Sequence, residues 1–258
     1  MSISGKVIDF SYIPYMIRET IFKTHEQRDS QGFRIRGHEV QRIETFSDAV
    51  FAFAVTLLIV SLEVPKTFGE LLVSMRGFFM FAVCFALLMT VWFQQHTWFR
   101  RYALDDTATV VLNSLLIFVV LFYVYPLKFL SSLLFGETIY GAGKSPFSIR
   151  PADGSLLMII YTAGYTTIYL IFLLMYRHAL RKKRLLQLSP LEEYDTRTML
   201  YAQLAMVLIG ICVAILALLL PPDKGGLAGL FFFAIGPAMW LVHGRRAVRR
   251  KMLEGHQE

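Results

Sequence analysis

Six apolar stretches of about 20 residues constrain the fold of this chain more than any other feature. They cover residues 46–64, 78–98, 107–127, 156–176, 199–220 and 227–243. A helix needs roughly 20 apolar residues to cross the hydrocarbon core of a bilayer. The sequence therefore predicts an all-α, polytopic membrane protein with six transmembrane helices per subunit. Gly236 and Pro237 predict a kinked or tilted last helix.

The composition supports this fold class. Hydrophobic residues make up 55% of the chain and charged residues only 17%, whereas a soluble domain has about 45–50% and about 25%. Such a surface has to be covered partly by lipid. Cys84 and Cys212 both lie inside apolar stretches, so we expect neither a disulfide framework nor a thiolate metal site. We expect no cofactor.

The basic residues are distributed unevenly between the two sides of the predicted membrane domain. With six spans, all but six of the 26 lysines and arginines fall on the side that holds both termini. The positive-inside rule then predicts a multi-pass protein of the cell (inner or plasma) membrane with both termini in the cytoplasm. The net charge is +7. We expect the lysines and arginines to lie beside the membrane and face an anionic lipid leaflet, and we expect no nucleic acid as a partner.

We divide the chain into three parts on these grounds. Residues 1–40 form an N-terminal cytoplasmic tail, residues 41–244 the six-helix transmembrane domain, and residues 245–258 a basic cytoplasmic C-terminal tail. Within the N-terminal tail, residues 28–37 have the composition of a linker. The apolar residues before them suit either an interfacial amphipathic helix or a tail that is floppy or bound to a partner, and the sequence leaves these alternatives open.

Charged and polar residues gather at the cytoplasmic ends of the first three spans. Arg42 and Asp48 lie on different sides of a helix that turns about 100° per residue, so they do not pair along it. The second span brings His96 to the same leaflet and the third brings Asn113. Ionisable groups at membrane depth cost several kcal/mol unless they are paired. We expect a mutually satisfied belt that either joins helices or titrates and gates.

An apolar stripe follows on the outer half of the first helix. Phe53, Leu57 and Val60 recur at spacings of four and three residues, and Thr56 lies on the edge of their stripe. Apolar residues at this spacing face lipid, a neighbouring helix or a pore. The residues alone leave these three alternatives open.

A charge, an aromatic ring and a second charge occur at fixed offsets in the motif Arg42-x-x-x-Phe46-Ser47-Asp48. Two further patterns accompany it, namely Trp92-Phe93-x-x-His96 and Leu112-Asn113-x-Leu115-Leu116. Together they resemble the signature of the endolysosomal-type potassium channels called transmembrane protein 175 and of their prokaryotic relatives. The resemblance covers about residues 40–130, whereas the last three helices agree with the family only in number and length.

This resemblance implies a single six-helix repeat that assembles as a homotetramer around a pore lined by the first helix. It implies passive, leak-type conduction that prefers potassium, with residues 41–244 as the channel domain. Carried over by position, the pore constriction is formed by Phe53, Leu57 and Val60, with Thr56 as a hydroxyl layer. The family usually has Ile or Leu in place of Phe53. The structural polar network comprises Arg42, Phe46, Ser47, Asp48, Trp92, His96 and Asn113.

Other functional classes make different demands on the sequence. A proton or cation permease needs ionisable residues near the bilayer midplane, and the central thirds of the six spans hold essentially none. An intramembrane enzyme needs paired carboxylates, a metal-binding spacing or a nucleophile beside a base, so we expect no enzyme. A non-conducting membrane scaffold stays open. The expected partners are further copies of this chain, lipid and monovalent cations, with K⁺ as the permeant ion.

Overall fold

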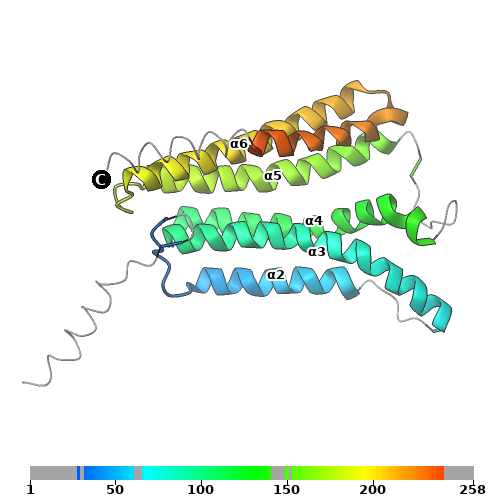
Figure 1. Ribbon diagram of the computed structural model, residues 1–258, viewed down its shortest axis with the longest axis horizontal. Helices are drawn as coiled ribbons and strands as arrows, with labels where there is room; N and C mark the ends of the chain where they lie inside the picture. Colours follow the sequence, from blue (N-terminus) through cyan, green and yellow to red (C-terminus); the bar gives the residue numbers. More distant parts are fainter. Residues whose placement is uncertain (1–27, 30–31, 61–65, 141–148, 151–152, 241–258) are drawn as a thin grey trace, which may run out of the picture.

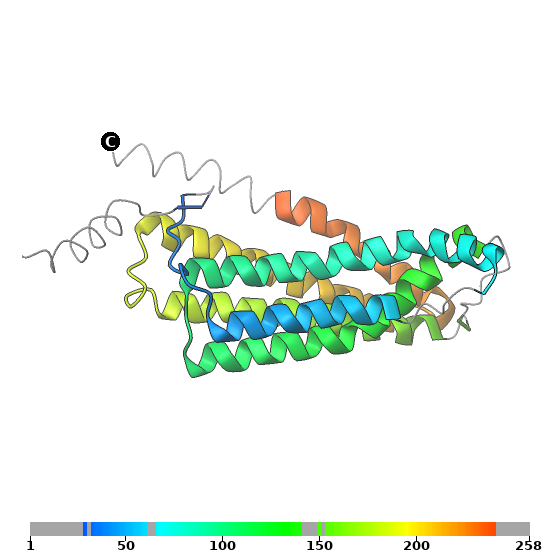
Figure 2. The same cartoon turned by 90° about the horizontal axis from the view of Figure 1, so that it is seen from below.

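The structure is a computed structural model that describes residues 28–29, 32–60, 66–140, 149–150 and 153–240. The helices are α2 (Arg42–Val60), α3 (Phe68–Tyr102), α4 (Thr107–Tyr140), α5 (Gly154–Arg181), α6 (Pro190–Leu219) and the 3₁₀ helix η2 (Pro222–Ala234). Figures 1 and 2 show that they run alongside one another as an elongated bundle. In the part of the chain described, the only β-type pairing is an isolated bridge between Arg28 and Arg34.

Three of the described segments are long and apolar enough to cross a membrane. They are Thr107–Leu133, Gly154–Arg181 and Pro190–Leu219. The helices also extend beyond the apolar windows, since α3 has 35 residues and α4 has 34. The structure therefore agrees with a helical membrane protein whose helices continue past the hydrocarbon core.

The last predicted span differs from a simple kinked helix. Its first part belongs to η2, and only residues 235–240 form an α-helical turn before the described chain ends. The irregular backbone therefore precedes Gly236 and Pro237 instead of lying at them. Pro237 lies in the first turn of this α-helical segment, which follows η2 directly.

The local sequence around Ser189 fixes the start of α6. Ser189 Oγ accepts a hydrogen bond from the Glu192 N–H at 3.2 Å, and Glu192 Oε2 accepts one from the Ser189 N–H at 3.0 Å. Pro190 occupies the first helical position. This is a capping box, which satisfies two backbone donors that the helix itself leaves free. Glu192 is thereby placed at a fixed position at the end of the bundle.

The helices pack as two groups. Helix α2 packs against α3 and α4, whereas α5, α6 and η2 pack together. The contact between α4 and α5 joins the groups, and Tyr102 of α3 also contacts Tyr176 of α5 and Thr196 of α6. Small residues allow close approach in the second group: a Cβ at Gly210 would collide with the Thr166 side chain. Such close contacts are the usual basis of helix association in membranes.

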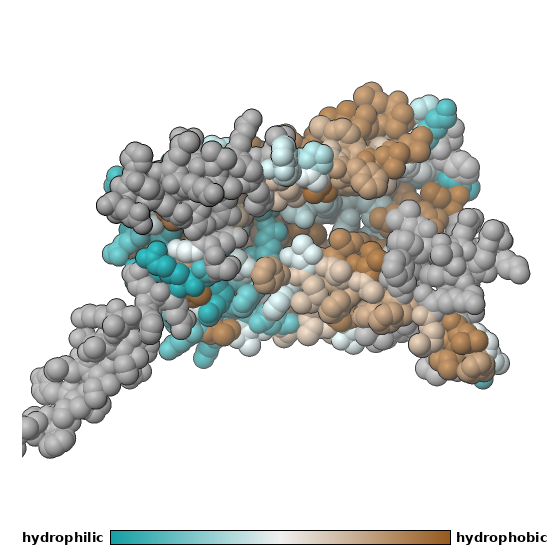
Figure 3. All heavy atoms as spheres, viewed as in Figure 1, coloured by the Kyte–Doolittle hydropathy of each residue, from teal (hydrophilic) through white to brown (hydrophobic). Residues whose placement is uncertain are grey.

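Polar and apolar residues separate along the bundle. Figure 3 shows hydrophilic residues gathered mainly toward the end where α2 begins and α3 ends, and hydrophobic residues over most of the remaining coloured surface. This arrangement matches a bundle with one polar end at a membrane surface and its length in lipid.

Candidate functional site

Helix α2 has one covered face and one uncovered face. Phe51, Ala54 and Leu58 are at most 4% exposed and pack in the core formed with α3 and α4. On the opposite side, Phe46 is 59% exposed and Phe53 is 56% exposed. The exposed residues, here called the open face of α2, are Arg42, Thr45, Phe46, Ala49, Ala52, Phe53 and Thr56. Their spacing of three and four residues makes one continuous stripe.

The predicted constriction residues are distributed unequally over these two faces. Phe53 and Thr56 lie on the open face, whereas Leu57 is half-buried and packs against the core. Val60 ends α2, and its side chain lies outside the described part of the structure. Thr56 Oγ1 donates to the Ala52 carbonyl at 3.0 Å. Its oxygen lone pairs therefore stay available on the open face.

Asn113 joins the first three helices on the covered side of α2. It is fully buried, and its Nδ2 donates to Ser47 Oγ at 2.7 Å. Its Oδ1 accepts from Gln95 Nε2 at 2.6 Å. Ser47 in turn donates to the Ile43 carbonyl at 2.8 Å. This chain satisfies the amide within the core and sets α2, α3 and α4 in one register.

A second group of contacts links α2 and α3 through their acidic and aromatic residues. Trp92 Nε1 donates to Asp48 Oδ1 at 2.7 Å, and the Trp92 ring stacks on His96 with centroids 5.3 Å apart. His96 Nδ1 lies 3.4 Å from Glu44 Oε1. Glu44 is only 5% exposed. It was not among the residues predicted from the sequence.

The predicted belt is thus brought together in a different pairing. Asp48 bonds to Trp92, and His96 pairs with Glu44. Asn113 bonds to Ser47 and Gln95. The three predicted residues do not bond to one another. Arg42 is exposed on the open face and contacts no acidic residue in the described ranges. Phe46 also lies on the open face and not in the network.

Residues 28–29 and 32–40, here called the N-terminal strap, pack against the polar end of the bundle. Phe33 is 1% exposed and meets Tyr102 of α3 edge-on, with ring centroids 5.5 Å apart. The guanidinium groups of Arg101 and Arg36 lie 5.0 and 5.6 Å from the Phe33 ring centre. Cation–π contacts of this kind add to the burial of the ring.

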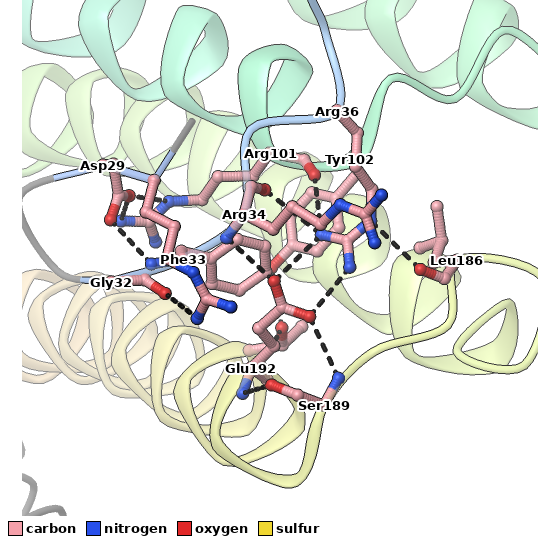
Figure 4. Close-up of polar contacts among 12 residues, drawn as sticks. Asp29, Gly32, Phe33, Arg34, Arg36, Arg101, Tyr102, Leu186, Ser189 and Glu192 are labelled. Carbon is pink, nitrogen blue, oxygen red and sulfur yellow. Dashed lines mark hydrogen bonds and ion pairs between the residues drawn. The ribbon is translucent and has the colours of Figure 1, made fainter. Parts of the chain in front are cut away.

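Glu192 at the start of α6 is the main anchor of the strap, as Figure 4 shows. Its carboxylate accepts from Arg36 Nη2 at 2.8 Å, from Arg36 Nη1 at 3.2 Å and from the Arg34 N–H at 2.8 Å. Arg101 of α3 donates to Asp29 at 2.6 Å. The interpretation of residues 28–37 as a linker is therefore wrong for the described residues, because their charges pair with positions distant in sequence.

The strap also fixes the point at which the chain enters α2. The Arg100 carbonyl accepts from the N–H groups of Arg36 and Gly37, both at 3.0 Å, and Arg100 Nη1 donates to the Gly37 carbonyl at 2.6 Å. A Cβ at Gly37 would lie 3.0 Å from the Phe99 carbonyl oxygen, so this close approach favours glycine. Gln41 then donates to the Ala103 carbonyl at 3.0 Å, one residue before α2 begins.

Asp106, in the connection between α3 and α4, forms a further cluster at this end. It accepts from Thr109 Oγ1 at 2.6 Å, and it lies 2.7 Å from Lys182 Nζ and 2.8 Å from His178 Nε2. Burial raises the pKa of Asp106, but the hydrogen bonds from Lys182, Thr109 and His178 outweigh it and hold this pKa well below its usual range. The carboxylate therefore ties the start of α4 to the end of α5.

Comparisons with known proteins bear on this arrangement directly. A sequence model of the family described as endosomal/lysosomal potassium channel TMEM175 matches residues 42–123, from the start of α2 into α4. A protein named "Potassium channel" from Marivirga tractuosa is 41% identical over 227 residues, which cover 83% of this chain and 90% of that protein. The chain belongs to the TMEM175 family.

Two further comparisons extend the match. A protein of Chamaesiphon minutus named as a potassium channel is 30% identical over 172 residues, which cover 63% of this chain and 77% of that protein. The crystal structure of a threonine-to-alanine variant of the potassium channel MtTMEM175, in complex with a nanobody–MBP fusion protein, superposes with a TM-score of 0.76. It shares 38% sequence identity and covers 86% of this chain and 100% of that chain.

These findings confirm the resemblance and enlarge it. The structural match reaches well beyond residues 40–130, so the TMEM175 fold includes the second helix group of this chain. The relatives are named as channels and not as enzymes, in agreement with the expectation that the chain is not an enzyme.

Proposed function

We propose that this TMEM175-family chain is a potassium-preferring cation channel that conducts passively as a homotetramer in the cell membrane. The open face of α2 carries the proposal. Beyond Arg42 at its start, it is a continuous stripe of apolar and hydroxyl residues on a helix whose other side is packed against α3 and α4. Four such stripes around one axis enclose a pore, which a single subunit does not provide. The matched potassium channels support the same function.

In this proposal Phe53 forms the narrowest ring of the pore. Its side chain is 56% exposed on the open face of α2, and four phenyl rings at one level make an apolar constriction. Such constrictions control conduction by dewetting, while the faces of the rings attract cations. Leu57 borders the constriction from its half-buried position, and Val60 is assigned to the constriction from its position along α2 alone.

Thr56 supplies an oxygen layer next to this ring. Because its hydroxyl hydrogen is directed to the Ala52 carbonyl, the oxygen presents lone pairs to the axis. Four such oxygens replace part of the hydration shell of a cation that passes the apolar ring. The preference for potassium is assigned to this layer.

The polar end of the bundle is assigned to the cytoplasm. The basic residues of the strap and of the turn between α5 and α6 lie at this end, which fits the positive-inside rule. Both termini then lie in the cytoplasm. The network around Asn113 and Asp48 holds α2 in register at the inner mouth of the pore.

The proposal is tested by flux from liposomes that contain the purified protein, with K⁺ or Na⁺ gradients. We expect K⁺ flux above that of empty liposomes and faster than Na⁺ flux. Phe53→Ala is expected to raise K⁺ flux by roughly tenfold, because it removes the dewetting ring. Phe233→Ala is the matched control, since that ring is 80% exposed on η2, and we expect no change.

Three results would contradict the proposal in different ways. A tetramer without flux points to a membrane scaffold, and flux that depends on a proton gradient points to a permease. If Phe53→Ala changes flux no more than Phe233→Ala does, the constriction is placed at the wrong residue.

A further inference from the structure

Lys128 lies inside α4 and within the segment Thr107–Leu133 that is long and apolar enough to cross the membrane. The apolar window in the sequence ends at residue 127 and assigns Lys128 to the following loop, but the helix continues to Tyr140. A lysine at membrane depth is costly unless it is stabilised, and such residues usually have a functional role.

The ammonium group of Lys128 contacts the end of α2. Its Nζ donates to the Leu58 carbonyl at 3.3 Å. Leu58 is in the last turn of α2, where the final four carbonyls have no partner within the helix. Helix α2 has no basic residue in its own last turn. Lys128 therefore provides, from α4, the positive charge that the negative end of the α2 dipole favours.

The backbone at Lys128 is held in place by two small polar residues. Ser131 Oγ donates to the Lys128 carbonyl at 2.8 Å, and Cys84 of α3 donates to Ser131 Oγ at 3.1 Å. Both side chains are at most 5% exposed. Lys128 itself is half-buried, and no carboxylate contacts it among the residues that the structure describes. Within the described residues, the charge of Lys128 therefore faces the C-terminal end of α2 and not a counter-ion.

We infer that Lys128 is a fixed positive charge at the outer end of the pore helix, where it limits the access of cations. This inference rests on the proposed function, because only a pore lined by α2 places four copies of Lys128 around one outer mouth. A ring of positive charge lowers the local concentration of cations. Salt screens the effect, since the Debye length falls from about 30 Å at 0.01 M to about 3 Å at 1 M.

The test compares K⁺ flux in liposomes at low and high ionic strength for the wild type, Lys128→Gln, Lys128→Met and Lys128→Arg. Glutamine keeps a hydrogen-bond donor but removes the charge, methionine removes both, and arginine keeps the charge. At about 0.01 M ionic strength we expect glutamine and methionine to raise flux on the order of threefold, with little change at about 1 M. Arginine is expected to behave like the wild type.

Lys66→Met serves as the matched control. Lys66 is exposed and lies just before α3, so its charge is screened by water and we expect less than half of the effect. All comparisons use tetramers isolated by size-exclusion chromatography. If Lys128→Met does not assemble, Lys128→Gln alone decides the question.

The outcomes separate this inference from the proposed function. Suppose that the wild type conducts K⁺ but the flux of Lys128→Gln at low ionic strength is unchanged or reduced. This result overturns the role of the Lys128 charge and leaves the proposed function standing. An increase of the same size at 1 M salt also overturns this role, since a loosened helix end and not a field would be responsible. A wild type without K⁺ flux overturns the proposed function and this inference with it.

Discussion

The Trp92 indole N–H is bonded to Asp48 at 2.7 Å, so the acidic residue of the first-helix motif is held by α3 within its own subunit. Arg42, six residues earlier, lies on the open face of α2. The two charges of the motif therefore face different surroundings. Asp48 contributes to the fold of one subunit, whereas Arg42 lies on the face of α2 that α3 and α4 leave uncovered. The sequence alone did not distinguish these two roles.

The contact between Trp92 and Asp48 is expected to contribute measurably to stability. In a double-mutant cycle of Trp92→Phe and Asp48→Ala, we expect a coupling free energy of about 1 kcal/mol, typical of polar pairs between membrane helices. Unfolding in mixed detergent micelles measures it. A coupling free energy near zero would mean that the bond contributes nothing to the packing of α3 on α2.

The strap is expected to depend on Arg36. Its side chain is 12% exposed and that of Glu192 is 5% exposed, so Arg36→Met leaves a buried carboxylate without its cation. We expect a loss of about 3 kcal/mol in the free energy of unfolding, measured in detergent.

Lys183→Met is the matched control for that variant. Lys183 also pairs with a glutamate of α6, Glu193, but the two side chains are 44% and 24% exposed. Exposed ion pairs contribute roughly 0–1 kcal/mol, so the loss should be far smaller. Equal losses for both variants would show that the strap is not a structural anchor.

Asp106 predicts a specific dependence of stability on pH. Burial opposes ionisation, but hydrogen bonds from Lys182, Thr109 and His178 prevail and lower the pKa of Asp106. A carboxyl group with a lowered pKa stabilises the fold above its unfolded pKa of about 3.9, and this contribution is lost as the pH falls toward the folded pKa. The difference in melting temperature between wild type and Asp106→Asn should therefore be largest above about pH 5 and shrink below about pH 4.

Asp105→Asn is the control for this series. Asp105 is the exposed neighbour of Asp106 and has no ion pair within the described ranges. We expect its melting temperature to follow that of the wild type at every pH. A constant difference between wild type and Asp106→Asn from pH 7 to pH 3 would exclude the proposed link between α4 and α5.

The helical fold and the polar region of α2 could be predicted because their signals are local. Apolar runs mark the centres of the helices, and helical spacing sets Phe53 and Thr56 on one side of α2. The helix ends could not be predicted in the same way. Lys128 directly follows an apolar window in the sequence, yet α4 continues past it to Tyr140, and its ammonium group bonds to the Leu58 carbonyl of another helix.

The remaining differences have the same physical origin. Residues 28–37 look like a linker since their arginines and glycines have no periodicity, but Arg36 bonds to Glu192, 156 positions away. Glu44 has its partner His96 on α3. Such pairings are determined by the packing of helices against each other. The sequence predicted that His96 lies in the same leaflet as the charges of the first helix, but not that it faces Glu44.

The most direct test of a pore along α2 is block of Thr56→Cys by Cd²⁺ in the K⁺ flux assay. Four cysteine thiolates around one axis bind this soft cation, so we predict that Cd²⁺ abolishes the K⁺ flux of the variant. The parent protein is the control, because its two native cysteines lie away from the open face of α2: Cys84 is buried on α3 and Cys212 is exposed on α6. We expect its flux to be insensitive to Cd²⁺. K⁺ flux through Thr56→Cys that is unchanged by Cd²⁺ would contradict the assignment of the open face of α2 to the pore.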